Sequence, residues 1–205
     1  MRATARFFFL RPMLTDQVLH DRINGERTVA AFEGLRNWLY WGLVLELSKI
    51  CSDDDNRSPS IIRVTEKLKN VHLRKQLEDK WVKQNREPGE DEEPLRVQFN
   101  REYSDYLRLA DETLSSHSIG GYKTVRNKLI AHNELRWSGS RYDFYDVKDA
   151  GLTIGDERRL LEMLQELAHQ LLRIVRGVDF TWETALHNDK KRARDFWGLA
   201  DQCGN

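Results

Sequence analysis

The chain has 205 residues, of which 40% are hydrophobic and 32% charged, and 33 Lys and Arg residues balance 33 Asp and Glu residues. This length and composition are typical of a globular protein with a sizeable core. The zero net charge excludes a strong field over the whole surface, so any affinity for nucleic acid has to come from a local patch. Cys51 and Cys203 lie far apart without a CxxC spacing, which favours a reducing cytosol over a disulfide framework or a zinc site.

The hydropathy of the chain argues against a membrane segment. No apolar stretch approaches the roughly 18 residues that a helix needs to span a bilayer, and the longest, residues 38–45, is typical of a buried helix. The apolar run at residues 7–10 is shorter than the core of a secretory signal, which has about 7–15 residues. We therefore expect a soluble, cytoplasmic protein that does not contact a membrane.

Hydrophobic residues recur at helical spacing from the N-terminal part onwards. A first helix is expected to open at Pro12 and Asp16 and to end at Asn24-Gly25, and a long second helix covers about residues 26–51. The apolar stripe of this second helix consists of Phe32, Leu35, Leu39, Leu43, Leu47 and Ile50, widened by Trp38 and Trp41. Core packing is the favoured interpretation of this face, and its width also allows a subunit interface.

The middle of the chain alternates helices with polar connectors. Residues 52–59 are predicted to form a loop, after which Ser60 caps a short helix. A further helix is expected over residues 71–86, and the acidic, proline-containing segment 87–94 is typical of a surface loop. Residues 95–116 then predict a helix with aromatic and aliphatic buried positions.

Two signals interrupt the helical pattern in the C-terminal half. Residues 115–121, which end in Gly120-Gly121, predict a break, and Ser118 is expected to cap the helix that follows. The aromatic segment 137–151 predicts a short β-hairpin.

The last part of the sequence predicts two more helices. Thr153 and Asp156 have the spacing of a capping box and precede a strongly apolar helix that ends at Gly177. A terminal helix over residues 180–202 is expected to dock on the bundle or on a partner. Because strand signals are nearly absent, we expect an all-α bundle that forms a single domain over residues 1–205.

The most distinctive stretch is residues 125–135, where Arg126 is followed directly by Asn127 and, later, by His132. On an ideal α-helix Arg126 and His132 lie about 120° apart around the axis and about 9 Å apart along it, so they flank one face without touching. Either the helix ends near Asn133, or a second copy of the chain completes the pair. From the residues alone, the favoured explanation is structural: a buried histidine with a satisfied hydrogen bond and an arginine at the edge of the bundle.

The pair Arg126-Asn127, followed by Ala131-His132, resembles the catalytic motif of HEPN domains, and the chain is most similar to their abortive-infection AbiU-type branch. The resemblance implies a HEPN-like antiparallel helical bundle with an additional C-terminal helix, acting as a ribonuclease toxin or phage-defence effector. It implies RNA as substrate, a homodimer, an antitoxin protein as partner and no metal or other cofactor. A related HEPN pattern has a tyrosine where this chain has Glu134, so regulation through that tyrosine is not expected.

HEPN ribonucleases cleave RNA by attack of the ribose 2′-hydroxyl on the adjacent phosphate, and the resemblance assigns the roles. His132 is the general acid/base, because an ordinary histidine pKa of about 6.5 suits proton transfer near neutrality. Arg126 clamps the phosphate, since its planar fork of donors matches phosphate geometry. Asn127 orients the substrate or the arginine.

A local excess of positive charge surrounds the motif. Lys123, Lys128 and Arg136 lie within it and are the candidate contacts to the RNA backbone, although an ordinary charged helix face has the same pattern. The alternative function is a non-catalytic helical interaction or nucleotide-binding module that uses the same face. In that case the histidine is a core residue and no RNA is cleaved.

Overall fold

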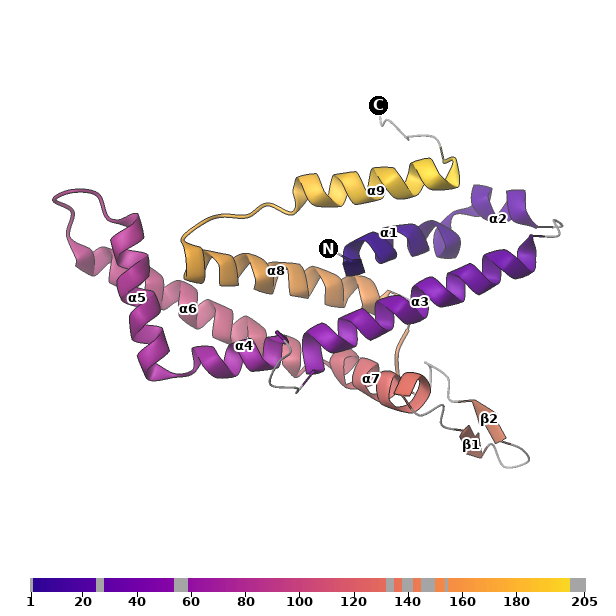
Figure 1. The fold of residues 1–205 in the computed structure, drawn as a ribbon, viewed down its shortest axis with the longest axis horizontal. Coiled ribbons are helices and arrows are strands. Elements are labelled where there is room, and N and C mark those ends of the chain that lie inside the picture. Colours follow the sequence, from indigo (N-terminus) through magenta and orange to yellow (C-terminus); the bar gives the residue numbers. More distant parts are fainter. Residues whose placement is uncertain are drawn as a thin grey trace. The chain divides into compact units, whose positions relative to one another are not determined.

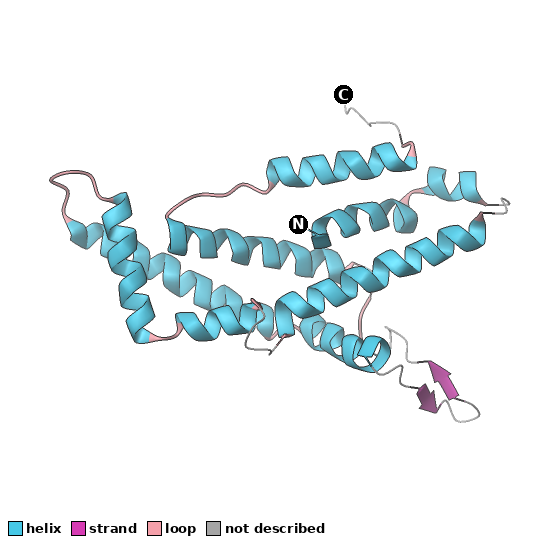
Figure 2. Ribbon diagram, in the orientation of Figure 1, coloured by secondary structure: helices cyan, strands magenta, loops and turns pink. Residues whose placement is uncertain are grey.

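The computed structural model describes residues 2–24, 28–53, 59–131, 135–137, 142–144, 150–153 and 155–199. Within these ranges the chain consists of helices and one short two-stranded hairpin, as Figures 1 and 2 show. The predicted all-α fold class is therefore confirmed. No helix in these ranges is both long enough and apolar enough to cross a membrane.

The helices form two compact units. Unit 1 combines residues 1–47 with residues 182–205, and unit 2 comprises residues 48–181. The boundary falls inside one long helix, so that unit 1 is built from two segments that are distant in the sequence. The single domain over residues 1–205 stays a prediction.

Unit 1 contains α1 (Arg2–Thr15), α2 (Gln17–Ile23), most of α3 (Val29–Ser52) and α9 (Glu183–Trp197). The first and the last helix, α1 and α9, pack against each other. Trp197 Nε1 donates a hydrogen bond of 2.9 Å to the carbonyl oxygen of Phe9. Edge-to-face ring contacts connect Phe9 with Phe196, Phe196 with Trp197 and Trp197 with Phe32. These aromatic contacts tie α9 to α1 and α3.

The N-terminal segment is helical from Arg2, so the prediction that the first helix opens at Pro12 is wrong. Pro12 lies inside α1, where its missing N–H removes one backbone hydrogen bond. The helix buries a set of apolar side chains at helical spacing, namely Ala3, Phe7, Leu10 and Met13. This burial outweighs the lost hydrogen bond. Asp16 caps α2 instead, because its Oδ1 accepts a hydrogen bond of 3.1 Å from the Leu19 backbone N–H.

Unit 2 contains α4 (Ile61–Leu68), α5 (Val71–Asn85), α6 (Glu92–Leu114), α7 (His117–Val125), the π-helix η1 (Arg126–Ala131), β1 (Leu135–Trp137), β2 (Tyr142–Phe144) and α8 (Asp156–Arg176). In this unit α6 packs along α8 and α5. Its core includes Leu68, Trp81, Val82, Phe99, Tyr103, Tyr106, Ala110, Leu167 and Ile174. Trp81 also donates a hydrogen bond of 2.9 Å from Nε1 to the Arg173 carbonyl oxygen, which fixes α5 against α8.

Several predicted helix ends are confirmed by their hydrogen bonds. Ser60 caps α4 by accepting from the Arg63 N–H, and Gly177 ends α8 with a left-handed φ of 62°. Thr153 donates from its backbone N–H to Asp156 Oδ2 at 2.7 Å, as the capping box predicts. Asp156 is, however, the first residue of α8, so the position that caps the helix is Gly155.

Other helix ends differ from the prediction. α6 begins at Glu92, inside the segment predicted as a loop, because Asp91 caps it by accepting from the Glu93 N–H at 3.2 Å. α9 is shorter at both ends than residues 180–202 and stops where Gly198 takes a left-handed φ of 60°. The predicted hairpin is confirmed, but it begins earlier, with Leu135 opposite Phe144 in antiparallel register.

Candidate active site

The helix that leads to the motif begins at His117, with Ser116 at its N-cap position. The predicted break at Gly120-Gly121 and the cap at Ser118 are therefore wrong, and both glycines lie inside α7. A Cβ atom at Gly121 would lie 2.8 Å from Leu152 Cγ and 2.9 Å from the Ala150 carbonyl oxygen. Gly121 is thus required by the close approach of residues 150–152 to the helix.

Three residues on one side of α7 are buried, namely Ile119, Tyr122 and Val125. The buried hydroxyl of Ser48, at the end of α3, donates a hydrogen bond of 2.9 Å to the Tyr122 carbonyl oxygen. The backbone N–H of Arg126 also bonds to this carbonyl. Ser48 and the buried face together fix the last turn of α7, immediately before the motif. Ser48 was missed by the sequence analysis, although a serine within the apolar stripe of α3 is a signal for such a contact.

Directly after Val125 the helix changes from α to π geometry, over Arg126–Ala131. Segments of π-helix are rare and frequently occur at functional sites. The angle of about 120° between Arg126 and His132 assumed α geometry throughout, so it does not apply to a π-helical segment. His132 itself, like Asn133 and Glu134, lies outside the described residues.

The Arg126 side chain is half-buried and is oriented by its neighbour in the sequence. Its Nε donates a hydrogen bond of 3.2 Å to Asn127 Oδ1. Among the described residues, the Arg126 side chain is hydrogen-bonded to Asn127 alone. Its two terminal NH2 groups are not bonded to any described residue. A guanidinium that is bonded through Nε and open at both NH2 groups can donate two parallel hydrogen bonds to one phosphate.

The predicted RNA-contacting residues have different environments. Lys123 is exposed on α7 and Lys128 is half-buried in η1. The backbone of Arg136 lies in β1, opposite Asp143 in β2, and its side chain lies outside the described residues. The structure therefore places Lys123, Arg126, Asn127 and Lys128 on one continuous helical segment.

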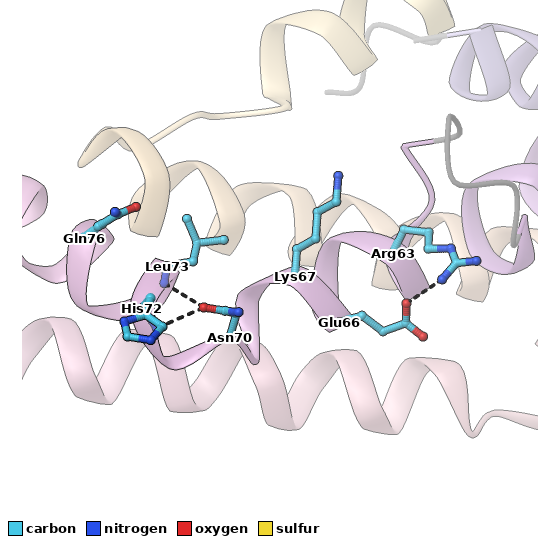
Figure 3. A pocket seen from close by; sticks show the side chains of 7 residues that line it. All are labelled: Arg63, Glu66, Lys67, Asn70, His72, Leu73 and Gln76. Atoms are coloured by element: carbon cyan, nitrogen blue, oxygen red, sulfur yellow. Dashed lines mark hydrogen bonds and ion pairs between the residues drawn. The ribbon is translucent and has the colours of Figure 1, made fainter.

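A separate surface hollow of about 550 Å³ lies at the junction of α4 and α5 and contains none of the predicted site residues, as Figure 3 shows. Arg63 Nη1 pairs with Glu66 Oε2 at 2.9 Å, and Asn70 Oδ1 accepts from the His72 and Leu73 N–H groups. The polar side chains of this hollow thus stabilise α4 and α5 locally. Among the residues with a described position, no three His, Cys, Asp or Glu side chains form a group that could hold a metal ion.

The described residues are mainly helical, and the Arg126-Asn127 pair directly follows the short helix α7, an arrangement that is similar to the HEPN class of domains. The sequence model of the HEPN AbiU2 family, described as AbiU2, matches residues 2–196. The chain therefore belongs to the HEPN AbiU2 family, which confirms the resemblance found in the sequence. No curated protein and no solved structure matches the chain.

Proposed function

We propose that the protein is a metal-independent endoribonuclease that acts as a toxin or phage-defence effector. Membership of the HEPN AbiU2 family supports a role in RNA cleavage or abortive infection. The observation that carries the proposal is the state of the Arg126 guanidinium. It is held by Asn127 through Nε, it follows the fixed last turn of α7, and its two terminal NH2 groups are not bonded to described residues.

In the proposed reaction the ribose 2′-oxygen attacks the adjacent phosphorus, and the bond from phosphorus to the 5′-oxygen of the next nucleotide breaks. His132 accepts the 2′-hydroxyl proton or donates a proton to the leaving 5′-oxygen, as a histidine with a pKa near neutrality is suited to do. Arg126 stabilises the charge that develops on the phosphoryl oxygens. Asn127 holds the guanidinium, and Lys123, Lys128 and Arg136 bind neighbouring phosphates.

The test is RNA cleavage by the purified protein in excess chelator, with the ends of the products analysed. We expect cleavage to persist, with a 2′,3′-cyclic phosphate on one product and a 5′-hydroxyl on the other. Loss of all cleavage in chelator, or cleavage that is unchanged in His132→Ala, would rule out the mechanism.

The second candidate is a non-catalytic module that binds a nucleotide or a partner protein through the same face. The zero net charge of the chain favours it, because non-specific RNA affinity depends on positive charge. It predicts that Arg126→Ala weakens ligand binding although no RNA is ever cut. Overexpression separates the two candidates, since only the enzyme is expected to arrest growth, and only while His132 is present. Growth arrest that a co-expressed neighbouring gene relieves would identify the proposed antitoxin.

A further inference from the structure

A second candidate site lies in unit 1, where α1 and α9 enclose a hollow of about 240 Å³. Its walls are formed by Phe8, Arg11, Pro12, Thr15 and Asp16 from the N-terminal segment and by Lys190 and Arg194 from α9. The hollow thus gathers three basic side chains from two helices. The lining also includes one aromatic ring, that of Phe8, and one carboxylate, that of Asp16.

The basic side chains are not distributed as on an ordinary charged helix. Lys190 and Arg194 are four residues apart on α9 and therefore share one face of it, where like charges repel. Arg11 adds a third positive charge from α1. A bound anion would lower the repulsion among these like charges.

The carboxylate in the hollow is already engaged, because Asp16 Oδ1 accepts from the Leu19 N–H as the cap of α2. Neither Arg11 nor Lys190 makes an ion pair with any residue whose position the structure describes. The hollow beside Asp79 and Arg96 in unit 2 differs in this respect, because there Arg96 Nη1 lies 2.9 Å from Asp79 Oδ1. Arg11 and Lys190 therefore bring positive charge to the unit 1 hollow that no described residue neutralises in an ion pair.

The apolar part of the hollow determines which anion it suits. The half-buried ring of Phe8 lines it and is fixed by an edge-to-face contact with Phe7, at 5.5 Å between centroids. Cations beside an aromatic ring are the combination that binds single-stranded nucleic acid, where the cations hold a phosphate and the ring stacks on a base. A volume of about 240 Å³ is below the roughly 300 Å³ at which pockets for drug-sized ligands begin. A nucleotide of a longer strand would therefore occupy the hollow only in part, with the rest of the strand outside it.

We propose that this hollow binds single-stranded RNA outside the motif, with one phosphate on Arg11, Lys190 and Arg194 and the adjacent base on Phe8. The choice of RNA rests on the proposed function, whereas the phosphate chemistry rests on the hollow alone. Such a site would supply binding energy from a part of the strand that does not react.

The experiment measures binding of a fluorescent single-stranded RNA of about 12 nucleotides by anisotropy, in an Arg126→Ala background so that the RNA is not cut. The double variant Arg11→Gln and Lys190→Gln is expected to bind more weakly. Its logarithmic salt dependence should be shallower by about 1. Phe8→Leu, which keeps an apolar side chain, is expected to lose at least about five-fold in affinity, the lower limit for base stacking.

The matched control is the double variant Lys191→Gln and Arg192→Gln, which also removes two positive charges, both from α9, at positions that do not line the hollow. Equal weakening by both double variants would mean non-specific electrostatic attraction and would overturn the proposal. Unchanged RNA binding in the Arg11 and Lys190 variant would also overturn the proposal. The same holds if a mononucleotide binds to the hollow while RNA binding does not depend on the hollow. Thermal melting shows whether the variants are folded, and relief of repulsion is expected to leave the melting temperature equal or higher.

The outcomes also separate this proposal from the proposed catalytic function. Specific RNA binding through the hollow by a protein that never cleaves RNA would support the site and contradict the nuclease. Cleavage that does not respond to the Arg11, Lys190 and Phe8 variants would support the nuclease and contradict the site.

Discussion

Arg126 illustrates how one contact between side chains prepares a residue for its proposed role. The bond from its Nε to Asn127 Oδ1 fixes the plane of the guanidinium, and a planar fork is what distinguishes arginine from lysine as a phosphate ligand. A role that needs only positive charge would not depend on this geometry. Replacing Arg126 by lysine, which keeps the charge and removes the planar fork, therefore separates the two roles.

Arg126→Lys is expected to lower turnover by about 10²-fold or more, because it removes the fork that stabilises the transition state. The free energy of unfolding should change by less than about 1 kcal/mol, since Arg126 is only half-buried and makes no described ion pair. Cleavage kinetics and chemical denaturation measure the two quantities. Arg108→Lys, the same change at an exposed position of α6, is the control and should alter neither. A melting temperature that falls in step with activity would show that Arg126 has a structural role instead.

Cys51 is buried at 1% exposure in α3, and burial raises the pKa of its thiol to about 12. We therefore expect the native protein to resist thiol reagents at about pH 8, where almost no thiolate exists. The thiol is therefore a weaker acid in the folded state than in the unfolded state, where its pKa is about 9. This contribution to stability is thus complete below about pH 9 and is lost as the pH rises towards 12. A Cys203→Ser variant isolates the Cys51 signal, and rapid labelling of the native protein would contradict the expectation.

At the scale of elements, we expect opposite effects on the free energy of unfolding when each of the two adjacent glycines of α7 is replaced by alanine. Gly121→Ala would bring a Cβ to 2.9 Å from the Ala150 carbonyl oxygen, so we expect a loss of about 1–3 kcal/mol in the free energy of unfolding. Gly120→Ala meets nothing within 4 Å and should instead stabilise the helix by about 0.5–1 kcal/mol. Denaturant unfolding of the two variants measures the difference. Equal effects at both positions would mean that residues 150–152 do not pack on α7 as described.

The same glycines show what the sequence can and cannot reveal about an element. Ser60 and Gly177 were predicted correctly because a cap and a left-handed helix end are local features. Gly121 was misread as a break because its reason is a contact with Leu152, thirty-one residues further along the chain. Local sequence signals identify where helices end. They do not reveal that a residue inside a helix has to be small because a distant part of the chain packs against it.

The candidate site shows a similar limit. The family was recognisable from Arg126, Asn127 and His132, and the family comparison confirms the family. The roles of these three residues stay predictions. The π-turn was not predictable from periodicity, because a helical wheel assumes 3.6 residues per turn at every position. The bond between Ser48 and Tyr122 joins residues that are far apart in the sequence, so it became visible only in the structure.

At the scale of the whole molecule, we propose a homodimer in which two copies of the motif share one cleft. Two copies related by a two-fold axis would present two arginines and two histidines to one RNA strand. Trp38 and Phe196 have 63% and 62% of their surfaces exposed and offer apolar area for contact. Trp41, which the sequence analysis placed on a face wide enough for a subunit interface, and Trp197 of α9 are half-buried within the chain, so they offer less.

The dimer predicts that two inactive variants restore each other's activity. Mixing Arg126→Ala with His132→Ala protein should yield heterodimers whose shared cleft keeps an arginine from one chain and a histidine from the other. Light scattering reports the mass, and RNA cleavage before and after mixing reports the complementation. A strictly monomeric protein that is fully active at nanomolar concentration would exclude the shared cleft.

Unit 1 joins α1 to α9 through the contact between Phe9 and Trp197, and unit 2 lies between them in the sequence. During synthesis on the ribosome, α1 therefore cannot pack against α9 until all of unit 2 has been synthesised. Unit 2 is contiguous and can fold in the meantime, because its packing partners emerge together. Folding of unit 2 first would shorten the flexible segment that the closure of unit 1 has to span. The hollow between α1 and α9 therefore forms only after α9 has been synthesised. During synthesis there is a stage in which the other helices exist and the proposed binding surface does not.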